Sequence, residues 1–315
     1  RDLHTTCRRQ ASDVYKRQKR GFVMGTKEIL EFVKIEHTLF SLPFVLIGYI
    51  LAHEQFIDEL ETQKFGIDLL WILVAAIGAR GLAMALNRII DRDVDAENPR
   101  TANRHLVSGS MTMQTAYLLS IGFLSMLLLG AWQLNEVALM MAWLPVAVFT
   151  IYPYVKRYSW LCHLWLGICL GLAPAGAWLA VAADIHGWGA ITDYLWSPEI
   201  LFISLGVMFW ITAFDINYAR MDVESDRENG IYSFPARFDE NTTTRTSVQL
   251  TLVWFACFAI SDPMDELWFL AAALTMALAN IVVILSRTKL EDFQTTFFRV
   301  SMLTGWVLLG AIMLE

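Results

Sequence analysis

The sequence predicts an all-helical integral membrane protein with nine transmembrane helices. Of its 315 residues, 56% are apolar and only 17% are charged, whereas soluble domains average about 25% charged residues. The apolar residues are gathered in stretches of about 20 residues, the length that crosses about 30 Å of hydrocarbon. Because a bilayer offers the backbone no hydrogen-bond partner, each stretch is expected to be a helix.

Nine such stretches follow one another along the chain. They cover residues 36–53, 67–90, 112–133, 136–155, 160–183, 199–221, 244–261, 264–286 and 296–314. Nearly all Lys and Arg residues fall in the N-terminal tail and in the loops after even-numbered stretches; Lys64 and the intramembrane Arg80 are the exceptions. Basic loops remain in the cytoplasm. We therefore expect a multi-pass protein of the inner (cytoplasmic) membrane, with a cytoplasmic N-terminus and an external C-terminus.

Residues 1–23 differ in character from the rest. They are polar and basic and contain no apolar core of a signal peptide. We interpret them as a non-native or disordered extension, the alternative being a basic arm at the membrane surface. Residues 24–315 then form one membrane domain. The net charge of −7 predicts no nucleic-acid partner, and no protein partner is predicted. The four cysteines show neither disulfide nor zinc spacing.

An amide and two carboxylates are regularly spaced where the second stretch ends. Asn87, Asp91 and Asp95 follow one another at intervals of four residues, which places them on one face of a helix, about 6 Å apart. Asp93 falls on another face and is expected in solvent. Acidic groups at the end of an apolar helix are costly unless a cation lies opposite them.

A second acidic cluster lies at the end of the sixth stretch. Asp222 and Asp226 are again four residues apart, with Asp215 and Tyr218 before them on the same expected face. One DxxxD pair is more often a solvated or capping pair, but two on the same side of a membrane favour a metal site. Mg²⁺ takes carboxylates together with phosphate oxygens. The two clusters therefore predict a Mg²⁺ and diphosphate site that faces the cytoplasm.

Cations are expected to complete this site. Arg100 and Arg104 follow the first cluster, and Lys156 and Arg157 end the fourth stretch; these side chains suit non-bridging phosphate oxygens. The alternative for the last two is a role as interfacial anchors. Arg80, inside the membrane, is a candidate for a substrate carboxylate or the diphosphate, or else a structural partner of a buried aspartate.

The remaining polar residues carry less information. The histidines at positions 53, 105, 163 and 186 show no metal-ligand spacing, and we expect them to be ordinary surface or interfacial residues. The rival function is a proton-coupled transporter, since intramembrane acids also suit such a carrier. The position of the acids at the ends of stretches, with cations in the facing loops, favours the phosphate site.

At these residues the chain resembles the UbiA superfamily of intramembrane prenyltransferases. The family pattern NxxxDxxxD is met by Asn87, Asp91 and Asp95, its DxxxD by Asp222 and Asp226, and its YxxxK by Tyr152 and Lys156. The resemblance implies helices around a central cavity with a cytoplasmic cap. It also implies that Mg²⁺ and the polar side chains bind a polyprenyl diphosphate, whose C–O bond ionises. The implied diphosphate-binding residues are Lys156, Arg157, Tyr152, Arg104 and Arg100.

The resemblance further implies attack by an aromatic ring at the position ortho to its hydroxyl. Asp215, with Asp91 and Tyr218, is then a candidate catalytic residue. Segments 36–44, 85–109 and 215–238 are similar to the 4-hydroxybenzoate polyprenyltransferase group of ubiquinone-type quinone biosynthesis. The alternative acceptor is 1,4-dihydroxy-6-naphthoate, used in futalosine-route menaquinone biosynthesis. Both acceptors are aromatic carboxylates, which would pair with Arg80 or with another buried cation.

Overall fold

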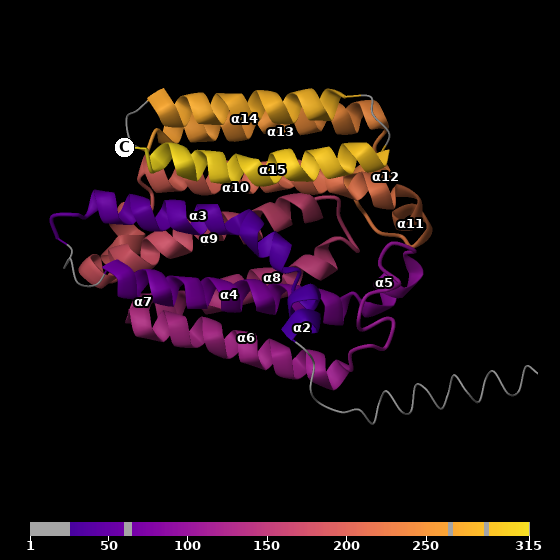
Figure 1. Cartoon of the computed structure of the whole chain (residues 1–315), viewed down its shortest axis with the longest axis horizontal. Helices are drawn as coiled ribbons and strands as arrows, with labels where there is room; N and C mark the ends of the chain where they lie inside the picture. Colours follow the sequence, from indigo (N-terminus) through magenta and orange to yellow (C-terminus); the bar gives the residue numbers. More distant parts are fainter. Residues whose placement is uncertain (1–25, 60–64, 264–266, 287–289, 315) are drawn as a thin grey trace, which may run out of the picture.

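Long helices lie side by side and form an elongated bundle in the computed structural model (Figure 1). The structure describes residues 26–59, 65–263, 267–286 and 290–314, and the predicted extension over residues 1–23 lies outside them. Within these ranges, nine long helical elements match the nine predicted stretches. They are α3 (Ile35–Gln55), α4 (Phe65–Ile90), α6 (Met113–Leu134), α7 with α8 (Glu136–Met141 and Trp143–Val155), α9 (Cys162–His186), α10 (Pro198–Tyr218), α13 (Glu240–Ser261), α14 (Leu267–Leu285) and α15 (Leu290–Ile312).

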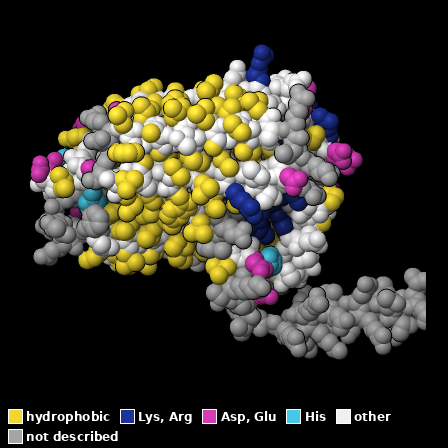
Figure 2. Space-filling model, turned by 45° about the horizontal axis from the view of Figure 1, so that its top comes forward, with side chains coloured by type: hydrophobic (Ala, Val, Ile, Leu, Met, Phe, Trp, Pro, Cys, Tyr) yellow, Lys and Arg dark blue, Asp and Glu magenta, His cyan; other side chains and the backbone are white. Residues whose placement is uncertain are grey.

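Seven of these elements are long and apolar enough to cross a membrane. The two that fall short are α3, whose apolar part is limited to Leu39–Gln55, and α13, which begins with a polar run over residues 240–247. Apolar side chains cover the middle of the bundle, and charged side chains gather toward its ends (Figure 2). This distribution is the one that a bilayer imposes on the outer surface of a multi-pass protein.

The centre of the bundle is formed by α9 and α10. Helix α9 packs against α3, α8 and α10; α10 also packs against α13, and α4 packs against α6 and α8. Helix α14 contacts α13 and α15, and α15 returns to α3. The short helix α2 (Thr26–Phe32) packs through Phe32 in a cluster with Ala85 and Ala116. Helices α9 and α10 therefore have neighbours on several sides.

Both acidic motifs lie at the same end of the bundle. The segments that carry them are α5 (Arg92–Glu97), the 3₁₀ turn η2 (Ala219–Asp222) and α11 (Val223–Glu228), followed by α12 (Phe234–Arg237). Helices α5, α11 and α12 lie together at one end in Figure 1, and the C-terminus lies at the opposite end. The acidic motifs and the C-terminus therefore lie at opposite ends of the bundle.

Close contacts at glycine hold α9 against its neighbours. A Cβ atom on Gly48 of α3 would overlap the backbone of Pro174 in α9, and one on Gly167 of α9 would overlap the carbonyl oxygen of Met208 in α10. Small residues allow helices in a membrane to approach closely, because lipid provides little hydrophobic driving force for their association. Substitution at these positions must push the helices apart.

We predict that Gly48→Ala destabilises the bundle. The added methyl meets backbone atoms, which cannot rotate away as a side chain can, and overpacking of this kind costs about 1–3 kcal/mol. The midpoint of thermal unfolding in detergent should fall. Gly122→Ala is the matched control, since a Cβ atom there meets nothing within 4 Å. Equal midpoints for the two variants would contradict the prediction.

Candidate functional site

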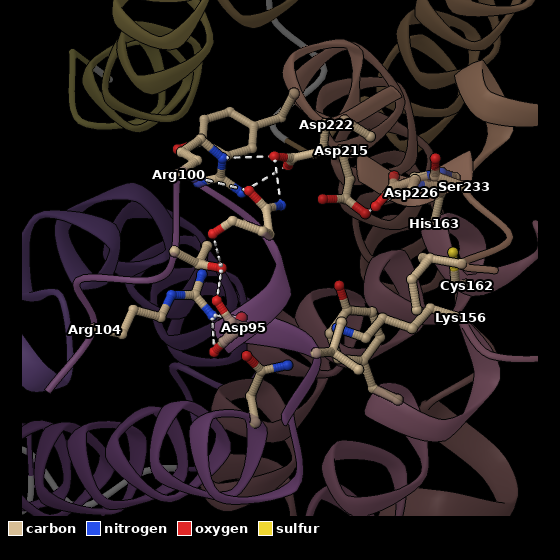
Figure 3. Close-up of a pocket in the computed structure, with 18 residues that line it drawn as sticks. Asp95, Arg100, Arg104, Lys156, Cys162, His163, Asp215, Asp222, Asp226 and Ser233 are labelled. Carbon is tan, nitrogen blue, oxygen red and sulfur yellow. Dashed lines mark hydrogen bonds and ion pairs between the residues drawn. The ribbon is translucent and has the colours of Figure 1, made fainter. Parts of the chain in front are cut away.

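A polar cavity of about 190 Å³ lies where the ends of α4, α8, α9 and α10 meet the short segments (Figure 3). Its wall contains most of the residues that the sequence singled out. The polar lining side chains include Asn87, Asp95, Asn98, Arg100, Arg104, Tyr152, Lys156, His163, Asp215, Tyr218, Asp222, Asp226 and Ser233. Arg100 with Asp222, Arg104 with Asp95, and His163 with Asp226 lie on different sides of it in Figure 3.

The first acidic motif follows a helix that is briefly interrupted. Helix α4 ends at Ile90, and Asp91 precedes α5 with φ −92° and ψ 5°. The backbone N–H of Asp91 donates to the carbonyl of Asn87 at 2.9 Å, and that of Asp95 donates to Asp91 at 2.7 Å. The turn therefore remains nearly helical across the break. Asp95 lines the cavity, and Asp93 is exposed as predicted.

Asp91 lies behind the cavity wall and has no exposed surface. Its Oδ2 accepts hydrogen bonds from Lys156 Nζ at 2.6 Å and Asn87 Nδ2 at 3.1 Å. Arg157 approaches Oδ1 at 3.6 Å and donates to the Ile90 carbonyl. Burial raises the pKa of Asp91, although Lys156 acts in the opposite direction. The first motif is thereby attached to the end of α8. Arg157, which the sequence suggested as a diphosphate-binding residue, does not line the cavity.

Hydrogen bonds to Asp222 join the two acidic motifs. Arg100 donates from Nε at 2.8 Å to Oδ1 and from a terminal nitrogen at 2.7 Å to Oδ2, and Asn98 donates to Oδ1 at 2.9 Å. Burial acts to lower the pKa of Arg100, but its bonds to Asp222 and the charge of Asp222 outweigh this and raise the pKa. Arg104 similarly holds both carboxylate oxygens of Asp95, at 2.7 and 2.6 Å. The motifs therefore border one cavity, as the sequence predicts.

The second motif does not lie on one continuous helix face. Helix α10 ends at Tyr218, and the 3₁₀ turn η2 carries the chain to Asp222 before α11 begins. The expectation that the spacing of an α-helix aligns Asp215 with Asp222 is thus wrong in its local geometry. Asp215, Tyr218, Asp222 and Asp226 nevertheless all line the polar cavity.

His163 is the site residue that sequence reasoning missed. We expected a surface or interfacial residue, but the side chain is 4% exposed and its Nδ1 lies 2.7 Å from Oδ2 of Asp215. Nε2 accepts a hydrogen bond from the backbone N–H of Phe234 at 2.9 Å. His163 lies near the start of an apolar stretch, on the same side as both acidic motifs, and this position could have identified it as a candidate site residue.

A larger, mainly apolar cavity of about 900 Å³ adjoins the polar one. Six residues line both: Asn87, Arg100, Arg104, Tyr152, Asp215 and Tyr218. The apolar wall comes largely from α4 and α9, with further residues from α3, α6 and α8, and it contains Arg80. The Nε atom of Arg80 is buried and has no hydrogen-bond partner among the described residues. A positive charge in such an apolar wall favours an anion in the adjoining cavity.

Comparison with known proteins identifies the family. Residues 41–303 match the UbiA prenyltransferase family over most of the chain. The chain belongs to this family. It is a multi-pass membrane prenyltransferase with the UbiA fold, and the apo structure of a UbiA homolog from Aeropyrum pernix K1 is similar, with 28% identity and a TM-score of 0.74 over 89% of this chain and 98% of that chain.

Two other proteins are similar to the chain. A 4-hydroxybenzoate octaprenyltransferase from Haemophilus ducreyi is 28% identical over 67% of this chain and 73% of its own length. A UbiA homolog from Archaeoglobus fulgidus bound to GPP and Mg²⁺ shares the fold, with a TM-score of 0.64 and 19% identity over 91% of this chain and 99% of that chain.

We predict that Lys156→Met destabilises this UbiA-family protein strongly. The substitution leaves Asp91 buried without its closest cation, and breaking a buried ion pair costs about 3–5 kcal/mol. The double variant Asp91→Asn with Lys156→Met should recover much of the loss, because it removes the stranded charge. Thermal unfolding of the purified protein measures both effects, and a double variant no more stable than Lys156→Met alone would contradict the prediction.

Proposed function

We propose that the protein transfers a polyprenyl group from its diphosphate to 4-hydroxybenzoate. The observation that carries this proposal is the junction of two unlike cavities. A small cavity rich in acids and cations suits a diphosphate, and the large apolar cavity beside it suits an isoprenoid chain. The bond that breaks in a prenyl diphosphate joins an ionic group to a hydrocarbon, so it would lie at that junction.

The acidic side chains fit Mg²⁺ in their chemistry. Asn87, Asp91, Asp95, Asp222 and Asp226 offer oxygen atoms, which Mg²⁺ prefers, and Oδ1 of Asp91 is buried without a hydrogen-bond partner among the described residues. The four of them that line the polar cavity, Asn87, Asp95, Asp222 and Asp226, would hold the metal, which would neutralise the diphosphate and make it a better leaving group. Asp91, expected from the sequence to be a ligand, lies behind the cavity wall and would support the site through Lys156 and Asn87. No group of three acidic, His or Cys side chains is already gathered around one point in the described ranges, since Asp95 and Asp222 are held by arginines instead.

The cations of the polar cavity would bind the diphosphate directly. Arg100, Arg104 and Lys156 each hold a carboxylate in the free protein. Phosphate oxygens are equally good acceptors for these donors, so a bound diphosphate would compete with the carboxylates for them. Tyr152 and Tyr218 line both cavities, and aromatic rings stabilise a nearby cation. They would border the allylic carbon as its bond to oxygen breaks.

The acceptor would enter beside Asp215 and Arg80. A ring carbon ortho to the hydroxyl forms the new bond to the prenyl carbon, the C–O bond to diphosphate breaks, and a proton leaves the acceptor. Asp215 lines both cavities and is placed to orient the phenol or receive that proton. Arg80 would pair with the acceptor carboxylate. Names of relatives such as the Haemophilus ducreyi protein support 4-hydroxybenzoate as this acceptor.

The proposed acceptor can be tested against the alternative in one assay. Purified protein with Mg²⁺ and a polyprenyl diphosphate should release diphosphate and form prenylated 4-hydroxybenzoate faster than prenylated 1,4-dihydroxy-6-naphthoate, with products identified by mass spectrometry. Chelation of Mg²⁺ should stop the reaction.

Asp95→Asn should lower kcat by about 100-fold or more, as loss of an electrostatic catalytic group does. Asp93→Asn, an exposed neighbour outside both cavities, is the matched control. If the naphthoate is prenylated faster than 4-hydroxybenzoate, the naphthoate is the acceptor. If neither compound is prenylated, the proposal is rejected.

The proposed role of Arg80 can be tested through the KM for the acceptor. Arg80→Met should raise KM for 4-hydroxybenzoate by roughly 10- to 150-fold, since a hydrogen bond to a charged group contributes about 1.5–3 kcal/mol. KM for the prenyl diphosphate should change little. Arg92→Met, on α5 and outside both cavities, is the control. An unchanged KM for the acceptor in Arg80→Met would remove Arg80 from acceptor binding.

A further inference from the structure

We propose that His163 is a positioning residue that holds the Asp215 carboxylate in place at the junction of the two cavities. The inference rests on the proposed function in assigning Asp215 a role toward the acceptor. It starts from one observation, that a single imidazole joins three separate elements. His163 belongs to α9, Asp215 to α10, and Phe234 begins α12.

The hydrogen bonds determine which ring nitrogen carries the proton. The Phe234 N–H donates to Nε2 at 2.9 Å, so Nε2 acts as an acceptor and has no hydrogen. In a neutral imidazole the other nitrogen is then the donor. Nδ1 of His163 therefore donates to Oδ2 of Asp215 across 2.7 Å. An imidazole that is 4% exposed has both nitrogen atoms satisfied in this arrangement.

The bond to Phe234 is part of the positioning. The first N–H groups of a helix have no partner within the helix, and Phe234 is the first residue of α12. His163 meets this need and is fixed in orientation by it. Asp215 is thereby held by a ring that cannot rotate without losing a backbone hydrogen bond. The same ring contacts residues on either side of the segment that carries Asp222 and Asp226, so it also fixes the two ends of that segment relative to each other.

One oxygen of Asp215 remains outside this bond. Oδ2 is taken by His163, whereas the side chain as a whole lines both the polar and the apolar cavity. His163 thus orients the carboxylate so that Oδ1 can face the acceptor hydroxyl.

Enzyme kinetics test whether His163 acts through Asp215. His163→Leu removes both hydrogen bonds and should lower kcat by about 10- to 100-fold, as loss of an orienting outer partner commonly does, with little change in KM for either substrate. His163→Asn places an amide nitrogen near the position of Nδ1 and should recover most of the loss. In an Asp215→Asn background, His163→Leu should have little further effect, because its target has already gone. His186→Leu, at the other end of α9 and outside both cavities, is the control for loss of a ring from this helix.

Spectroscopy tests the same geometry without turnover. In protein labelled with ¹⁵N-histidine, the resonance that disappears in His163→Asn should report a neutral ring protonated at Nδ1, and it should shift in Asp215→Asn. A ring protonated at Nε2, a kcat for His163→Asn as low as that for His163→Leu, or equal losses from His163→Leu in both backgrounds would overturn the proposal. Absence of turnover in the wild-type protein would instead reject the proposed function, and the spectra would still decide the tautomer and its bond to Asp215.

Discussion

Charge pairing at one end of an apolar bundle is the constraint on which the rest of this structure depends. A carboxylate at the end of a membrane helix is costly unless a cation or donor meets it. Lys156 meets Asp91 and so attaches the end of α8 to the end of α4; Arg100 meets Asp222 and so attaches the first acidic motif to the second. The helix ends are thus held around one polar cavity by ion pairs between their oppositely charged side chains.

These pairs also order the cations of the site before an anionic substrate binds. Each arginine or lysine is held by a carboxylate close to the cavity, so its side chain is already largely ordered. Ordering such long side chains on binding would otherwise oppose affinity. The same acids that hold the cations carry the oxygen atoms that suit Mg²⁺. The polar cavity therefore combines both kinds of group that a metal–diphosphate substrate needs.

Under the proposed function, the neighbouring apolar cavity would separate the hydrocarbon part of the reaction from its ionic part. Asp215, Tyr152 and Tyr218 stand at the boundary and line both spaces. Arg80 lies in the apolar wall, where, under the proposed function, its guanidinium would pair with the carboxylate of the acceptor. His163 contributes from behind this boundary, because its two ring nitrogens join Asp215 to the start of α12.

The sequence by itself determined the membrane class, the order of the helical stretches and the two acidic motifs, because hydropathy and the spacing of charged residues are local properties of the chain. It also placed Arg80 inside the membrane. Only the tertiary structure decided that Asp91 is buried behind the wall while Asp95 lines it, that a 3₁₀ turn separates Asp215 from Asp222, and that His163 meets Asp215. These outcomes depend on contacts between α4, α8, α9 and α10, and residues 52 positions apart, such as His163 and Asp215, leave no periodic signal that would show they meet.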